Sequence, residues 1–275
     1  MELNEFRIRC KRKTGFSIIP LGDIHLGTKA CDEKALKETI DHIAQNPNCY
    51  WVGMGDYADF INLADPRFDS KVLAPWLSTK DLDNLAAIQA SKVAEYLEPI
   101  KKKCLGLLCG NHEETIRRRY SYHVAEHICN SLGVKYLTWA ALIRIVAIDD
   151  AVQGGHDAIR LYAEHGTGGG RYTGAKLNAI QMDGKFIDAE IYCRGHVHEK
   201  VASINPCLSI TTRGNPAWVE TSRVFVLTGS FLRTYHFDPE TPYSTYAERM
   251  SYPATAIGSP EIHIRFDPYR VTVKT

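Results

Sequence analysis

Five short polar segments of the chain carry the residue types that bind metal ions. They are Asp23-Ile24-His25, Gly55 to Asp59, Gly110 to Glu113, His165-Gly166 and Gly195 to His198. Carboxylate, imidazole and amide groups suit divalent cations of intermediate hardness. The spacing of two within Asp23–His25 and within His196–His198 would direct both side chains of each pair to one side of an extended backbone. The pattern therefore predicts a metal centre built from several loops.

Each of these segments follows an apolar run that is typical of a β-strand. The runs are Phe16–Pro20, Tyr50–Met54, Leu105–Cys109, Ile159–Glu164 and Ala189–Arg194. In α/β proteins, ligands bind beyond the carboxyl ends of the strands. We therefore expect the five segments to meet at one end of a sheet structure.

Helical patterns separate the strands of the first half, and further strands dominate the second half. The expected helices are Asp32–Gln45, Thr79–Lys102, a helix capped by Ser121 that ends at Gly133, and the far end of Gly170–Met182. The further strands are Ala141–Ile148, Lys200–Ile204, Val224–Leu227 and Ile262–Phe266. This order predicts an α/β fold of two packed sheets flanked by helices, in a single domain over residues 1–275.

Composition excludes several classes of protein. With 44% hydrophobic residues and a net charge of +1, the chain of 275 residues is not disordered, collagen-like or a coiled coil. So small a charge creates no field that would draw the whole molecule to a membrane or to nucleic acid. Residues 1–13 are charged, and no apolar stretch approaches the roughly 18 residues of a membrane span, so we expect a cytoplasmic protein. The eight cysteines contain no Cys-x-x-Cys pair and are expected to be free thiols.

Taken together, the five segments resemble the calcineurin-like metallophosphoesterases. The family pattern is Asp-x-His, Gly-Asp-x-x-Asp, Gly-Asn-His-(Asp/Glu), a solitary His and Gly-His-x-His, and all five blocks occur here in that order. The resemblance implies a four-layer α-β-β-α sandwich of two mixed sheets with a two-metal site between them. It assigns one metal to Asp23, His25, Asp56 and His198, and the other to Asp56, Asn111, His165 and His196, with Asp56 as the bridge.

The resemblance also implies a reaction, the hydrolysis of a phosphoester by a hydroxide that the two cations generate. His112 would protonate the leaving oxygen, and Asp59 would orient and charge His112. Four histidines among the ligands disfavour magnesium. Manganese, as Mn²⁺, is the first expectation for the two ions, with iron, zinc and nickel as alternatives.

The branch of the family is narrowed by two departures from the protein Ser/Thr phosphatases. Asp59 is followed by Phe60-Ile61 where those enzymes have Arg-Gly, and the chain carries the Gly-His-x-His ending that they lack. Both favour the phosphodiesterases and nucleases, including bacterial and phage phosphoesterases. The expected substrate is a phosphodiester of DNA, RNA or a nucleotide. The alternatives are a phosphomonoesterase for nucleotides or small phosphates, a protein phosphatase and a non-catalytic scaffold.

A few basic side chains follow the metal-binding segments closely enough to contact phosphate. Arg117, Arg171 and Lys176 are the candidates, although the run 117–119 is equally typical of a solvated helix face. Four other histidines have no supporting neighbours in the sequence and are expected to be structural; they are His42, His156, His236 and His263. No pattern indicates an oligomeric state.

Overall fold

Two mixed β-sheets lie face to face in the computed structural model, which describes residues 1–152, 155–211, 214–236 and 243–275. The six-stranded sheet has the order β1 (Glu2–Arg9), β5 (Ala140–Ile148), β6 (His156–Glu164), β7 (Ile191–Arg194), β9 (Trp218–Thr228) and β8 (Lys200–Ile210). The five-stranded sheet has the order β11 (Tyr269–Lys274), β10 (Glu261–Phe266), β2 (Phe16–Leu21), β3 (Cys49–Gly53) and β4 (Cys104–Leu107). Each sheet combines parallel and antiparallel pairs, such as β2 with β3 and β10 with β2.

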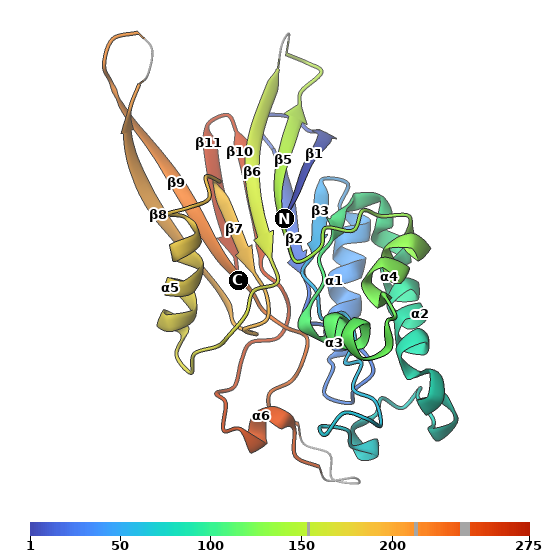
Figure 1. The fold of residues 1–275 in the computed structure, drawn as a ribbon. Helices are drawn as coiled ribbons and strands as arrows, with labels where there is room; N and C mark the ends of the chain where they lie inside the picture. Colours follow the sequence, from blue (N-terminus) through green and yellow to red (C-terminus); the bar gives the residue numbers. More distant parts are fainter. Residues whose placement is uncertain (153–154, 212–213, 237–242) are drawn as a thin grey trace.

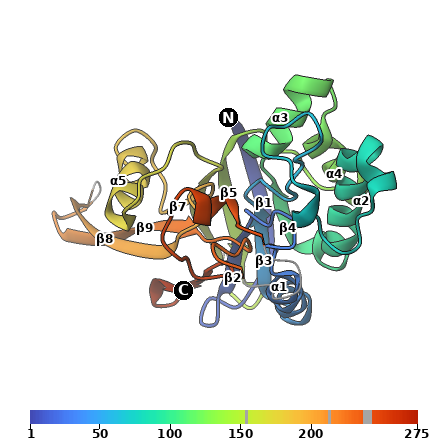
Figure 2. The same cartoon turned by 90° about the horizontal axis from the view of Figure 1, so that it is seen from below.

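Helices cover the outer faces of both sheets. On the five-stranded side lie α1 (Glu33–Gln45), α2 (Leu85–Leu97), α3 (Asn111–Tyr120) and α4 (Val124–Leu132) (Figure 1). The opposite flank is covered by α5 (Thr173–Asp183), as the view from below makes clear (Figure 2). The predicted fold of two sheets flanked by helices is thereby confirmed. A short helix, α6 (Tyr246–Arg249), lies at the lower end of the sheets in Figure 1.

The core follows from the alternation of side chains along the strands. In β2, Ile18 points between the sheets, where it joins Ile143 and Ile191 of the other sheet. Its neighbour Ile19 points the other way and packs with Trp51 in the core beneath the helices. The central strands β2 and β3 are thus buried on both faces, whereas β1 and β8 of the six-stranded sheet carry exposed side chains.

The expected helix Thr79–Lys102 is wrong as a single element. The structure has a 3-10 helix at Thr79–Asn84, α2 at Leu85–Leu97 and a second 3-10 helix at Glu98–Lys103. Pro99 has no N–H to donate and so cannot continue the α-helical hydrogen bonds. No helix within the described ranges is both long enough and apolar enough to cross a bilayer.

The expected role of Ser121 is also wrong. Ser121 ends α3 as its C-cap, with a left-handed φ of 53°, and its N–H donates to Arg117 O at 3.0 Å. The next helix, α4, begins only at Val124 and ends at Gly133 as expected. The spacing of apolar residues in the sequence did not predict α3, because its residues Asn111–Tyr120 are mostly polar.

The left-handed conformation of Ser121 yields a test of this assignment. A glycine adopts that conformation without the clash that a Cβ creates, so we expect Ser121→Gly to stabilise the protein by about 1 kcal/mol. Ser121→Ala should bring no such gain. Urea unfolding of the two variants measures both changes. A loss of about 1 kcal/mol in Ser121→Ala without a gain in Ser121→Gly would instead indicate an N-cap.

Candidate metal centre

The five polar segments meet at one end of the two sheets. They begin within three residues of the ends of β2, β3, β4, β6 and β7. Backbone hydrogen bonds join neighbouring segments: Asp23 N donates to Gly55 O at 2.9 Å, and His25 N donates to Asp56 O at 3.1 Å. The strand-end placement predicted from the sequence is confirmed.

Five of the seven expected ligands adopt left-handed backbone conformations. The φ values are 46° for Asp23, 52° for His25, 51° for Asp56, 67° for His196 and 55° for His198. The expected extended geometry of the two spaced pairs is therefore wrong. Each non-glycine residue in this conformation destabilises the folded protein by about 1–3 kcal/mol. Backbone strain of this kind is found most often at functional sites. The loops coil tightly enough to bring residues of several strands to one point.

One group of ligands contains Asp23, His25 and His198. The Nε2 atoms of His25 and His198 lie 3.2 Å apart, and His198 Nε2 lies 3.4 Å from Asp23 Oδ1. The Asp23 carboxylate is oriented by the backbone N–H of His196, which donates to its two oxygens at 2.9 and 3.1 Å. Asp23 and His25 are buried.

A second group contains Asp56, His165 and His196, with Asn111 beside it. His165 Nδ1 donates to Met54 O at 2.7 Å, which leaves the lone pair on Nε2. That Nε2 lies 3.1 Å from Asn111 Oδ1 and 3.4 Å from Asp56 Oδ2. Asp56 also forms a group with His25 and His112, so its carboxylate lies between the two sets of ligands.

These residues fit divalent cations. Donors around a tetrahedral zinc-like ion with bonds of about 2.1 Å lie about 3.3 Å apart, and the donor atoms here are separated by 3.1–3.4 Å. Two imidazole Nε2 atoms that face each other, with a carboxylate beside them, are typical of a site that shares a cation. The buried Nδ1 of His25 also has no hydrogen-bond partner among the described residues.

The electrostatics of the centre favour bound positive charge. Burial alone would raise the pKa of Asp56, but the imidazoles of His165 and His112 hold it well below its ordinary value. Burial would likewise lower the pKa of His165, yet Asp56 and Asp23 raise it to about 10. The two buried carboxylates therefore attract cationic partners strongly at this point of the fold.

Glu113 holds the loop after β3 against the loop after β4. Its Oε2 accepts from Asp56 N at 2.9 Å and Gly110 N at 2.8 Å, and its Oε1 accepts from Tyr57 N at 2.8 Å. Burial, and then repulsion from Asp56, raise the pKa of Glu113 to about 7. The approach is so close that a Cβ on Gly110 would lie 2.1 Å from Asp56 Oδ1. Glu113 thus sets the position of the central carboxylate without belonging to the expected ligands.

His112 and Asp59 are adjacent, but the expected contact between them is only partly right. The ring Nδ1 of His112 forms a short hydrogen bond with the backbone carbonyl of Asp59, not with its carboxylate. The carboxylate lies instead 3.6 Å from Nδ1 of His25. Asp59 therefore orients His112 through the main chain, while the backbone N–H of His112 donates to Asp56 Oδ1 at 2.9 Å.

The centre opens into a cavity of about 630 Å³. Seven of the nine expected metal ligands and catalytic residues line it, namely His25, Asp56, Asp59, Asn111, His112, His196 and His198. Basic side chains line the rest, namely Arg67, Arg171, Lys176, Arg233 and Arg249. The segments around α6 and 168–171 form its outer walls.

The three predicted phosphate contacts have different surroundings. Arg171 and Lys176 line the cavity, and Lys176 donates to Glu199 Oε1 at 3.0 Å and to Val197 O at 3.2 Å. Arg117 does not line it; its guanidinium pairs with Glu114 on α3 at 2.6–2.7 Å.

Sequence reasoning missed Arg67, Arg233 and Arg249. Arg67 follows the block Gly55–Asp59 by eight residues, whereas Arg233 and Arg249 are far in sequence from every metal-binding block. The structure brings Arg233 near the centre because it follows the segment 228–232, in which Ser230 Oγ donates to Asp23 O at 2.8 Å.

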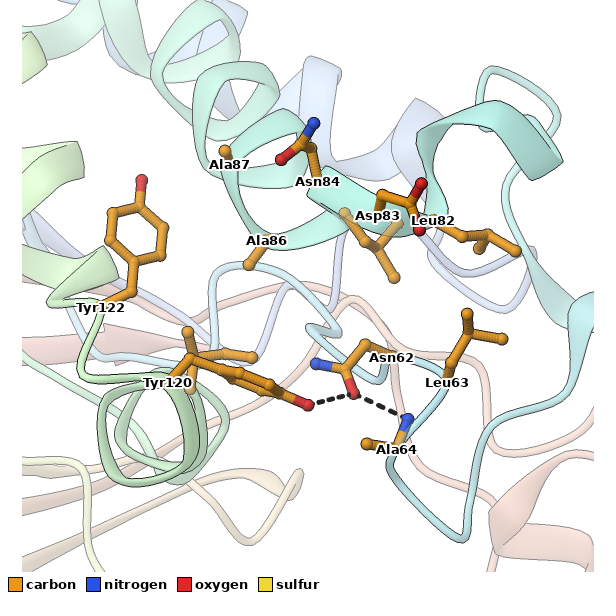
Figure 3. Close-up of a pocket in the computed structure, with 12 residues that line it drawn as sticks. Asn62, Leu63, Ala64, Leu82, Asp83, Asn84, Ala86, Ala87, Tyr120 and Tyr122 are labelled. Atoms are coloured by element: carbon orange, nitrogen blue, oxygen red, sulfur yellow. Dashed lines mark hydrogen bonds between the residues drawn. The ribbon is translucent and has the colours of Figure 1, made fainter.

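A second, smaller cavity of about 320 Å³ lies away from these ligands, between α2 and the end of α3 (Figure 3). Its wall includes Asn62, whose Oδ1 accepts from Tyr120 Oη at 2.9 Å and from Ala64 N at 3.1 Å (Figure 3). None of the predicted site residues lines this cavity.

Comparisons with known proteins contribute little beyond this geometry. No protein-family model matches the sequence, and no curated protein matches it. Among solved structures, the chain is similar to a single mutant of Vps29 from Entamoeba histolytica, at 11% identity and a TM-score of 0.29. The alignment covers 94% of this chain and 98% of that one. A TM-score this low supports no conclusion about fold or function, so both rest on the residues themselves.

The clamp formed by Glu113 can be tested through metal affinity. Glu113→Gln replaces one of the two acceptor oxygens by an NH₂ group, so a backbone N–H of the two loops loses its partner. We expect Mn²⁺ affinity to fall about 10–100-fold, as for other residues that position metal ligands. Calorimetric titration measures the change.

The neighbouring Glu114→Gln variant is the control, since Glu114 pairs only with Arg117 and Arg118 on the helix surface among its described contacts. The Mn²⁺ affinity of the Glu114→Gln variant should match that of the unmodified protein. Equal losses in both variants would contradict the role of Glu113.

Proposed function

We propose that the protein is a metal-dependent phosphoric ester hydrolase that cleaves phosphodiester bonds of nucleic acid or nucleotides. One observation carries the proposal: seven candidate metal ligands from five separate loops, with Asp56 among them at the centre, converge beside His112 at a cavity that is partly lined by basic side chains. The resemblance of the five blocks to metallophosphoesterases supports the same reaction class.

Two cations fit the two groups of ligands. One would be held by Asp23, His25, Asp56 and His198, and the other by Asp56, Asn111, His165 and His196. When bound, two divalent cations supply Lewis acidity and lower the pKa of water toward neutrality. The nitrogen-rich donor set favours manganese, iron, zinc or nickel over magnesium.

His112 is placed to handle the proton of the leaving group. Its Nδ1 donates to the Asp59 carbonyl, which fixes the ring and directs Nε2 away from that loop. Burial lowers the pKa of His112, but the carboxylates of Asp56 and Asp59 outweigh it and raise the pKa above its ordinary value. A protonated Nε2 can then give its proton to the departing oxygen.

The cavity has room for more than a phosphate group. At about 630 Å³ it lies within the range of small-molecule sites, which are about 300–1,000 Å³. Arg171 on its wall can neutralise phosphate oxygens, whereas Lys176 is already paired with Glu199. The ring of Tyr252 offers a surface for a base. A substrate with groups on both sides of the phosphate suits this shape, which supports the diester.

Substrate class is tested by comparing two esters on manganese-loaded protein. We expect bis-p-nitrophenyl phosphate to be hydrolysed with a higher kcat/KM than p-nitrophenyl phosphate, because the cavity extends beyond the phosphate. Absorbance of the released nitrophenolate measures both rates. A clear preference for the monoester would support the phosphomonoesterase instead. Digestion of single- and double-stranded DNA and RNA then separates nucleic acid from nucleotide substrates.

The proton donor is tested by His112→Gln. We expect kcat to fall about 10²–10⁴-fold for a diester with an alkyl leaving group, because the leaving oxygen loses its acid. The loss should be much smaller for a p-nitrophenyl ester, whose leaving group needs no proton. Metal content by elemental analysis should stay unchanged.

His127→Gln, on the exposed face of α4, is the control and should retain full activity. Equal losses for good and poor leaving groups in His112→Gln, with metal content unchanged, would show that His112 is not the acid.

A further inference from the structure

Four potential ligands gather at the opposite end of the five-stranded sheet from the metal centre. His42 comes from α1, Cys49 from the start of β3, and Glu261 and His263 from β10. The strand register brings them together: His263 is paired with Ser17 of β2, and Ser17 is paired with Cys49. Ser17 precedes Asp23 by six residues along β2, so this cluster lies about 20 Å from the metal centre.

All four side chains belong to the helix side of this sheet. Ile262 and Ile264 of β10 point into the core between the sheets, so Glu261 and His263 point the other way, toward α1. Cys49 packs in the core beneath the helices together with Trp51. His42 lies on α1 directly over this end of the sheet, where its ring meets Glu261.

The donor atoms of His42, Cys49 and Glu261 all lie within 4.8 Å of one another, and His263 joins this group only through its contact with Glu261. Glu261 Oε2 lies 3.3 Å from Nε2 of His42 and 3.5 Å from Nε2 of His263. The thiol of Cys49 lies within 4.8 Å of the donor atoms of both His42 and Glu261. Donors around a tetrahedral zinc ion are about 3.3–3.8 Å apart, the longer values applying to sulfur.

Buried polar atoms of this cluster lack partners. Oε1 of Glu261 is buried without a hydrogen bond to any described residue. Only 12% of the Glu261 side chain is exposed, whereas 48% of His42 and 47% of His263 are exposed. Cys49 is fully buried, and its Sγ contacts Tyr50 O at 3.8 Å and the side chain of Ser17. A carboxylate and a thiol thus lie inside, beneath two imidazoles that solvent can reach.

We propose that His42, Cys49 and Glu261 form a second metal site, for a single zinc ion, with His263 beside Glu261 as the fourth donor. Nitrogen, sulfur and oxygen donors in this number are those of tetrahedral zinc sites, and a thiolate is a poor ligand for magnesium or calcium. The site is structural: it joins α1 and β3, which are adjacent in the chain, to β10, which follows more than 200 residues later. The antiparallel pairing of β10 with β2 covers only three residue pairs, so a metal link would secure the β10–β11 hairpin.

Cobalt(II) titration of the full chain, with thiols kept reduced, tests this site through a signal that the metal centre does not produce. A thiolate bound to cobalt gives a near-ultraviolet charge-transfer band, and the predicted ligands of the metal centre include no cysteine. We expect the intensity of the band at saturation to correspond to one thiolate-bound cobalt per chain, whatever amount of cobalt the metal centre also takes up. It should vanish in Cys49→Ala, and His42→Gln should weaken the binding that it reports at least about tenfold.

Cys207→Ala and His127→Gln are matched controls, because they remove a half-buried thiol and an exposed imidazole elsewhere. Both should keep the band and its midpoint. Three outcomes would overturn the proposal: absence of the band in the unmodified protein, its survival in Cys49→Ala, or unchanged binding in His42→Gln. The last would leave only a salt bridge between His42 and Glu261. Activity toward phosphoesters plays no part in this readout, so the proposed function stands or falls separately.

Discussion

The carboxylate of Glu113 holds together the loops on which the metal centre depends. It accepts three backbone N–H groups, from Asp56, Tyr57 and Gly110. These donors belong to loops after two neighbouring strands, and the carboxylate itself lies on the first turn of α3. Because Asp56 lies between both groups of candidate ligands, a shift of this one loop would move both groups. A buried carboxylate with three donors is costly to disturb, since each broken bond leaves a desolvated group.

Strain and burial act together at this end of the fold. Five left-handed non-glycine residues and two buried carboxylates would each destabilise an ordinary loop. The two sheets supply the compensation through a core that continues to the carboxyl ends of the strands, where it includes Met54, Leu108 and Cys193. The opposite end of the five-stranded sheet carries no such strain among its described ligand candidates, and its polar atoms cluster through strand register alone. The strands therefore position both the metal centre and the cluster of His42, Cys49 and Glu261. The first lies on loop residues with left-handed backbone conformations, whereas the second lies on residues of regular helices and strands.

Much of the fold was predictable because hydrophobic runs report buried strands directly. The runs that precede the five polar segments are strands in the structure, and Asp32 caps α1, with its side chain accepting from Ala35 N at 3.1 Å. Elements without such runs were missed. The strand β1 at the sheet edge alternates charged and apolar residues, and α3 is largely polar because most of its surface faces solvent. Local patterns of apolar residues indicate which segments are buried. Elements with few buried apolar residues, such as β1 and α3, are therefore not predicted from them.

By itself, the sequence determined the residue types of the candidate metal centre, their order along the chain and their positions after strands. Those properties are local, since an apolar run followed by Asp-x-His needs no knowledge of distant neighbours. Only the tertiary structure decided that Asp59 reaches His112 through its carbonyl, and that Arg233 lines the cavity while Arg117 pairs with Glu114. It also brought His42, Cys49 and Glu261 together across more than 200 residues of chain. Contacts between such distant residues depend on strand register and sheet packing, which no local pattern encodes.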